Sequence, residues 1–194
     1  MARHWVLRQA FAQLEQWCAE GLQADFVMSI NISPRQFRHQ DFSRQVGRLL
    51  DQYSIQPQQI LFELTETALL DHMEDTGREM MLLQSSGIRF ALDDFGTGYS
   101  SLSYLKRLPL AQLKIDKSFV QDVARDPNDA AIARSIIGLG QNLDIDVLAE
   151  GVEDESIYNF LVHAGCTQFQ GYWFGRPVPA RQFRSDWLSQ RIRD

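Results

Sequence analysis

Residues 89–101 read RFALDDFGTGYSS, an apolar run that ends in two adjacent aspartates, two glycines and small hydroxyl residues. Two neighbouring carboxylates repel each other unless a proton or a cation lies between them. The stretch fits a buried strand that runs into an ordinary surface turn, with the glycines there for positive φ. It fits a functional site at the end of a strand equally well, and the rest of the chain decides between the two interpretations.

The size and charge of the chain limit the classes of function. Its 194 residues are 44% hydrophobic and 23% charged, which is typical of one globular domain. The formal net charge of −6 argues against a general binder of nucleic acid or anionic membrane, so no DNA partner is expected. No apolar stretch is long enough to cross a bilayer, and no secretory signal pattern opens the chain, so direct membrane insertion is not expected. Cys18 and Cys166 match no CxxC motif and the four histidines are scattered, which favours a reducing cytoplasm and disfavours zinc.

Short apolar runs alternate with helical patterns along the chain. The runs predict strands over residues 26–33, 60–66, 89–95, 112–116, 146–152 and 168–173. Helices are predicted over residues 4–21, 41–53, 75–87, 101–108, 128–144, 155–165 and 181–194. This alternation indicates a parallel sheet with crossover helices, in an α/β domain without linkers or repeats.

Side-chain parity distinguishes an open doubly wound sheet from a (β/α)8 barrel. In each predicted strand one face is apolar, while the other becomes polar toward the strand end; Phe90 and Leu92, for example, oppose Asp93. A doubly wound sheet is covered by helices on both faces, so its strands are nearly all apolar. The sheet of a barrel is covered by helices on its outer face only, and the active site lies on the inner face at the C-terminal ends of the strands. The pattern therefore predicts a barrel.

Polar residues near the strand ends share this second face. One comes from each strand in order, and three more carboxylates follow closely: Asn31, Glu63, Asp93, Lys114, Glu150 and Gln170, then Glu66, Asp94 and Glu153. Oxygen ligands without histidine or cysteine suit hard cations such as Mg²⁺ or Mn²⁺. Two such ions, bridged by one of the paired aspartates, are a common device for hydrolysing phosphate esters. A lysine on the same rim could orient or deprotonate the attacking water, or offset phosphate charge. The residues alone lead to metal-assisted phosphoester hydrolysis.

Six motifs in order give the chain a family resemblance. SINIS, FELTET, ALDDFGTGYSSL, LKIDKSFV, LAEGVE and QGYWFGRP resemble the signature blocks of EAL-domain cyclic-di-GMP phosphodiesterases, from about His4 to Trp187. The resemblance implies a (β/α)8 TIM-like barrel that hydrolyses cyclic di-GMP to linear pGpG with two Mg²⁺ or Mn²⁺ ions. It also implies a location in the bacterial cytoplasm, where the domain is either free or tethered through upstream domains.

The resemblance also implies roles for individual residues. Asn31, Glu63 and Asp93 would hold the first metal, and Asp93, Asp94 and Glu150 the second, with Asp93 as the bridge. Lys114 would engage the catalytic water and Glu66 would steady the loop after the double aspartate. Glu153 and Gln170 would face the substrate, with Glu153 near a guanine.

A dimerisation element is implied in the same way. The loop of Phe95, Gly96, Thr97, Gly98, Tyr99 and Ser100, with the helix after it, resembles the family's dimerisation segment. Through that segment, homodimerisation and upstream sensory or GGDEF-type domains would adjust the metal site.

The chain departs from the family pattern at its start. The Glu-Ala-Leu motif and the arginine that follows it are absent. Residues 1–194 are therefore expected to form a single EAL domain that lacks its first two strands and keeps six of the eight. An excised fragment, a partner chain that supplies the wall, or a truncated gene would each explain this. Because a glutamate ligand of the first metal is missing, we expect much reduced hydrolysis.

Two other functions compete with the phosphodiesterase. A non-catalytic cyclic-di-GMP receptor or protein-interaction module would usually have lost metal ligands, whereas those within this chain's span are intact. An unrelated barrel hydrolase, such as a metal-dependent phosphotriesterase, would need histidine ligands that are lacking here.

Overall fold

The structure, a computed structural model, describes residues 2–66, 73–97 and 105–188. Its strands are β1 (Met28–Asn31), β2 (Ile60–Thr65), β3 (Arg89–Phe95), β4 (Gln112–Ile115), β5 (Asp146–Glu150) and β6 (Gln168–Gln170). Its longer helices are α1 (Ala2–Ala19), α3 (Phe42–Gln52), α5 (Met73–Ser85), α8 (Pro127–Leu143) and α9 (Glu155–His163). Shorter turns of helix are α2 (Pro34–Phe37), η1 (Pro57–Gln59), α7 (Lys117–Val120), α10 (Ala180–Phe183) and η2 (Arg184–Leu188).

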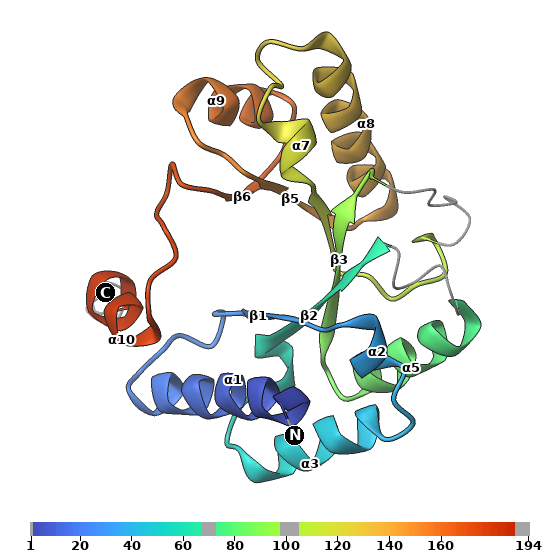
Figure 1. The fold of residues 1–194 in the computed structure, drawn as a ribbon, viewed down its shortest axis with the longest axis vertical. Coiled ribbons are helices and arrows are strands. Elements are labelled where there is room, and N and C mark those ends of the chain that lie inside the picture. The colour runs from blue at the N-terminus through green and yellow to red at the C-terminus, as the bar shows by residue number, and fades with distance from the viewer. Residues whose placement is uncertain (1, 67–72, 98–104, 189–194) are drawn as a thin grey trace.

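The six strands form one parallel sheet in the order β1-β2-β3-β4-β5-β6. Sequential order means that the winding never reverses, whereas a doubly wound sheet has a switch point where it does. Figure 1 shows the sheet curled, with α1, α2, α3 and α5 on the side of β1 and β2 and with α7, α8 and α9 on the side of β5 and β6. The fold is a curled half-barrel, and the predicted incomplete (β/α)8 barrel of about six strands is confirmed.

The two faces of the sheet differ as parity predicts. Ile30, Phe62 and Leu113 point to the helices and are at most 5% exposed. Aromatic rings fill this layer, where Phe90 lies 6.1 Å from Phe62 and 6.0 Å from Phe37 between ring centroids. Burying such side chains contributes about 1.5–3 kcal/mol each, so the apolar face supplies most of the stability. The other face is left for polar groups.

Local capping explains where the helices after the rim begin. The Asp126 side chain accepts a hydrogen bond from Asn128 N, and Pro127 occupies the first turn of α8. The Asp154 side chain accepts one from Ile157 N at the start of α9. Both caps satisfy backbone donors that a helix leaves without a partner, which explains why α8 and α9 begin at these residues.

The segment after β6 returns across the fold to α1. Figure 1 shows it running from β6 to α10, which lies near the C-terminal end of α1. The Phe183 ring lies 5.5 Å from the Trp17 ring, and Arg184 Nε pairs with Glu20 Oε2 at 2.8 Å. Because α1 packs on β1, this segment connects the last strand of the sheet to the helix that covers the first.

The predicted elements match the structure within a few residues at their ends. The six strands and the helices over 4–21, 41–53, 75–87, 128–144 and 155–165 are confirmed. The first half of the predicted helix over 101–108 lies outside the described residues, and the predicted helix over 181–194 is described only to residue 188, as the short turns α10 and η2. The sequence did not predict α2, η1 and α7, which are too short for a helical periodicity to show. In the described part of the chain, no helix has the length and apolar character required to cross a membrane.

Candidate active site

The carboxyl ends of the six parallel strands meet at one rim. Strand register pairs Asn31 with Glu63, Thr65 with Asp93, and Glu150 with Gln170. Between Leu92 and Phe95 the pairing of β3 with β4 shifts, which is a β-bulge at the double aspartate. Bulges re-aim side chains next to active sites. The register therefore gathers the predicted residues at one edge of the sheet.

Three of the predicted carboxylates converge on Lys114. Its Nζ lies 2.8 Å from Glu63 Oε2, 2.9 Å from Asp93 Oδ1 and 2.7 Å from Glu150 Oε1. These groups come from β4, β2, β3 and β5, so one lysine joins four strands. Lys114 is 3% exposed and Glu63 is 6% exposed, while Asp93 and Glu150 are half-buried, so the cluster is buried at its centre and partly open at the rim. We call these four residues the Lys114 cluster.

The electrostatics of the cluster follow from burial and charge pairing. Burial alone would lower the pKa of Lys114, but hydrogen bonds to Glu150, Glu63 and Asp93 outweigh it and raise the pKa above its ordinary value. Burial raises the pKa of Glu150, and the ammonium of Lys114 opposes that rise. At neutral pH Lys114 is therefore an ammonium ion, and in this arrangement it is a hydrogen-bond donor.

The double aspartate lies in a strained turn. Asp94 has φ 56°, a left-handed conformation that L-residues other than asparagine and aspartate rarely adopt, and Gly96 has φ 103°. Asp94 N donates to Asp93 Oδ1 at 3.1 Å, and Thr97 Oγ1 donates to Asp94 O at 2.8 Å. Burial, and then the charges of Asp93 and Asp116, raise the pKa of Asp94. The turn thus directs the two carboxyl groups differently while keeping both at the rim.

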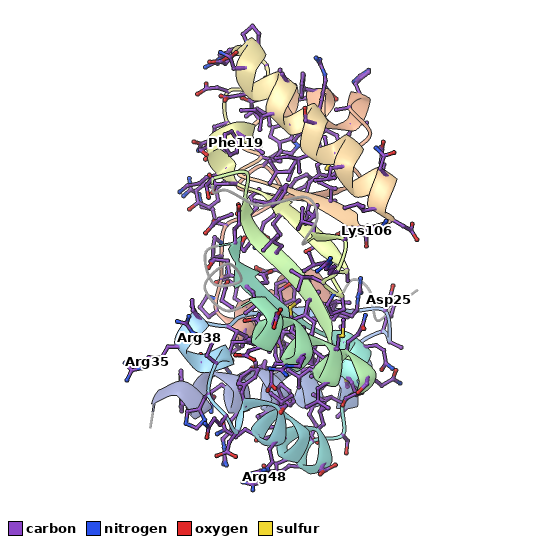
Figure 2. The ribbon with its side chains drawn as sticks, turned by 90° about the vertical axis from the view of Figure 1, so that its right-hand side faces the viewer. Asp25, Arg35, Arg38, Arg48, Lys106 and Phe119 are labelled. Carbon is purple, nitrogen blue, oxygen red and sulfur yellow. The ribbon has the colours of Figure 1, made fainter. Side chains whose placement is uncertain are left out.

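Glu66, the residue that directly follows β2, contacts this turn. It is 2% exposed, and Gly96 N lies 3.4 Å from its Oε2 in hydrogen-bonding geometry. A Cβ on Gly96 would lie 3.0 Å from the ring of Phe119, which Figure 2 labels, so the loop also packs closely on α7. The contact agrees with a supporting role for Glu66, which stays a prediction. Gly98, Tyr99 and Ser100 of the predicted dimerisation loop lie outside the described residues.

The remaining predicted residues lie around the cluster and not in it. Asn31 is exposed on β1, in register with Glu63. Glu153 is exposed, and its Oε1 accepts a hydrogen bond from Gln121 Nε2 at 3.3 Å. Gln170 is exposed at the end of β6, beside a hollow of about 420 Å³. Tyr172 and Arg176 line that hollow, with the guanidinium 4.4 Å from the centre of the ring.

The structure adds polar groups that the sequence interpretation did not select. Asp116 faces Asp94 and accepts a hydrogen bond from Ser118 N at 2.9 Å. Deeper on the same face, Gln112 Nε2 donates to Gln168 Oε1 at 2.6 Å. Strand parity was the available signal, because Gln112 and Gln168 each lie two residues before a selected residue.

The oxygen donors at the rim are of the kind that bind hard cations. Within the described ranges, no three His, Cys, Asp or Glu side chains are already arranged to hold an ion. The common partner of Glu63, Asp93 and Glu150 is the Lys114 ammonium instead. Even so, three carboxylates around one cation, with further carboxyl and amide oxygens nearby, are the chemistry that Mg²⁺ and Mn²⁺ prefer. The residues fit a hard divalent cation.

Comparison with known proteins decides the family. The family model described as "EAL domain" matches residues 2–177. The chain belongs to the EAL domain family. The resemblance to EAL phosphodiesterases seen in the sequence is thereby confirmed, and the half-barrel is an incomplete EAL barrel.

Two named relatives of this EAL chain illustrate the similarity. It is 41% identical to the bifunctional diguanylate cyclase/cyclic di-GMP phosphodiesterase MucR of Pseudomonas aeruginosa, over 92% of this chain and 26% of MucR. The solved PaMucR phosphodiesterase in complex with c-di-GMP matches with TM-score 0.89 and 40% identity, over 93% of this chain and 72% of that one. A manganese and cyclic-di-GMP complex of Klebsiella pneumoniae BlrP1 matches with TM-score 0.81 and 31% identity, over 91% and 44%. The chain spans about a quarter of the length of the curated relatives it matches.

Proposed function

We propose that this EAL domain hydrolyses cyclic di-GMP to linear pGpG. The observation that carries the proposal is the Lys114 cluster, in which carboxylates from three strands meet at the C-terminal rim of an EAL barrel. The relative MucR is named a cyclic di-GMP phosphodiesterase, and the PaMucR structure is a c-di-GMP complex. Intact carboxylates support an enzyme over a receptor that only binds the dinucleotide.

Two divalent ions, Mg²⁺ or Mn²⁺, are part of this proposal. Asn31, Glu63 and Asp93 would hold the first ion, and Asp93, Asp94 and Glu150 the second. When bound, such a pair stabilises both the attacking and the leaving oxygen of the phosphodiester. The manganese complex of BlrP1 supports this choice of metal.

The chain's own groups would orient the water and the substrate. Because its pKa is raised, Lys114 is suited to donate a hydrogen bond to the attacking water or to a phosphate oxygen, and less suited to remove a proton. Glu66 would hold the turn of the double aspartate through Gly96 N. Glu153 and Gln170 would contact the dinucleotide, with the hollow beside Gln170 as its entrance.

The wider context is proposed on the same basis. The domain would act in the bacterial cytoplasm or be tethered there, joined to sensory or GGDEF-type domains, since it spans a quarter of a bifunctional relative. Homodimerisation would use the segment after Asp94.

We expect low turnover from these 194 residues. In the described sheet β1 and β6 each have a single neighbour, so Asn31 lies at an exposed edge. A longer chain with two more strands between those edges should hydrolyse cyclic di-GMP faster. Equal turnover by the two chains would contradict this expectation.

An Asp93→Asn variant tests the site directly. Asp93 is the proposed bridge, so its replacement should reduce metal-dependent pGpG release about a hundredfold, within the range for groups that stabilise transition-state charge. Asp122→Asn is the matched control, because Asp122 is exposed on the loop after α7. Binding of cyclic di-GMP without release of pGpG, in the unaltered chain, would support the receptor instead.

A further inference from the structure

The Lys114 cluster contains three carboxylates and one ammonium in a largely buried space. The ion pairs measure 2.7–2.9 Å, and the exposed fraction of the four side chains runs from 4% for Lys114 to 19% for Glu150. Carboxylates this close in a low-dielectric site repel one another strongly when no cation lies between them. Lys114 therefore holds the oxygens of Glu63, Asp93 and Glu150 around one point.

The same oxygens are proposed ligands of the divalent ions. A lysine ammonium is a compact charge on a flexible stem, so it can leave one partner and take another without unfolding its strand. We propose that Lys114 is a positioning residue that assembles the three carboxylates in advance, and that its ammonium and a divalent cation exchange at their oxygens. This inference rests on the proposed function, because it assumes that the carboxylates bind metal.

If the Lys114 ammonium and a divalent cation compete for the same oxygens, replacing Lys114 has opposite effects on metal affinity and on stability. A divalent cation no longer competes with a resident positive charge, so its affinity for the site rises. The chain without metal becomes less stable, because three carboxylates are left without their buried partner. A residue that served only to pack the sheet would lower stability without raising metal affinity.

The experiment is calorimetric titration of the full chain with Mn²⁺ alone. Lys114→Met should bind Mn²⁺ at least about tenfold more tightly than the unaltered chain, since a unit charge at contact distance is removed. Its melting temperature without metal should fall, and the rise on adding Mn²⁺ should be larger than in the unaltered chain. Arg48→Met is the matched control, because Arg48 is exposed on α3 (Figure 2) and the loss of its charge should leave Mn²⁺ affinity unchanged.

The possible results separate this inference from the proposed function. Equal or weaker Mn²⁺ binding by Lys114→Met, or no binding by either chain, overturns the exchange. Tighter binding by Lys114→Met supports it even when the unaltered chain releases no pGpG, an outcome that would count against the proposed function alone. Should Lys114→Met fail to fold, Lys114→Gln removes the same charge and keeps a polar side chain, and the same criterion applies.

Discussion

Gly171 is the residue whose replacement gives the sharpest test of how the rim is built. It follows β6 directly, and the Val152 backbone lies against it. A Cβ at position 171 would lie 2.0 Å from Val152 O and 2.4 Å from Val152 N. Two hydrogen bonds hold the segments together, Val152 N to Gln170 O at 3.1 Å and Trp173 N to Val152 O at 3.0 Å. Val152 lies between Glu150 and Glu153, so this contact sets the position of both.

The loss of stability expected for Gly171→Ala follows from these distances. Real Cβ contacts are almost never shorter than 3.0 Å, so the two backbones must separate by at least about an ångström. Backbone atoms cannot rotate away as a side chain does, so the cost should reach the upper end of overpacking, about 3 kcal/mol. For a chain of this size that corresponds to a melting temperature lower by about 6–12 °C. A displacement of Glu150 by about an ångström should also reduce catalysis about a hundredfold.

Thermal unfolding, Mn²⁺ titration and pGpG release are the measurements. Gly138→Ala is the matched control, because a Cβ at that position in α8 would have no atom within 4 Å apart from its chain neighbours and the adjacent backbone of its own helix. It should leave activity unchanged and stabilise the helix by up to about 1 kcal/mol. A Gly171→Ala chain with unaltered melting temperature and Mn²⁺ affinity would refute the reasoning.

Three further predictions concern the rest of the fold. Phe183→Ala should lower stability by about 1–3 kcal/mol, since the ring makes two aromatic pairs, with Trp17 and Phe26; thermal unfolding should show no such loss for exposed Gln182→Ala. Burial raises the pKa of Cys166, so a disulfide reagent at pH 8 should modify half-buried Cys18 first and Cys166 only on unfolding; fast modification that persists in Cys18→Ser would contradict this. Burial alone would raise the pKa of Asp116, but hydrogen bonds from Ser118 lower it. The Asp116 carboxylate therefore stabilises the fold at pH values above its unfolded pKa of about 3.9, and this contribution is lost as the pH falls through the folded pKa. The stability difference between Asp116→Asn and the unaltered chain should therefore shrink from pH 7 to pH 3, and a constant difference would disprove it.

Strand parity predicted the fold because alternate residues of a strand point to opposite faces of the sheet, and their polarity indicates what covers each face. Phe90 and Leu92 face the helices while Asp93 faces the rim, and a single strand is enough to read this. The same alternation predicted that Glu63, Asp93, Lys114 and Glu150 lie on one face. Local sequence determines which face a strand residue takes, so this part of the site was accessible without a structure.

The arrangement within the site was not accessible in the same way. No sequence pattern indicates that one ammonium contacts three carboxylates, because that depends on strand register and on the β-bulge between Leu92 and Phe95. The bonds of Gln112 to Gln168 and of Arg184 to Glu20 join residues distant in sequence, and only the packed chain brings them together. The short helices α2 and α7 were missed because one turn carries no periodicity.

The most direct test of the central claim is incubation of the 194-residue chain with cyclic di-GMP, followed by chromatography of the products. One sample contains Mn²⁺ or Mg²⁺ and the other contains EDTA. The account predicts that pGpG accumulates with metal and not with EDTA, because the carboxylates at the rim require a divalent ion for hydrolysis. Absence of pGpG at every metal concentration, or release that EDTA leaves unchanged, would contradict it.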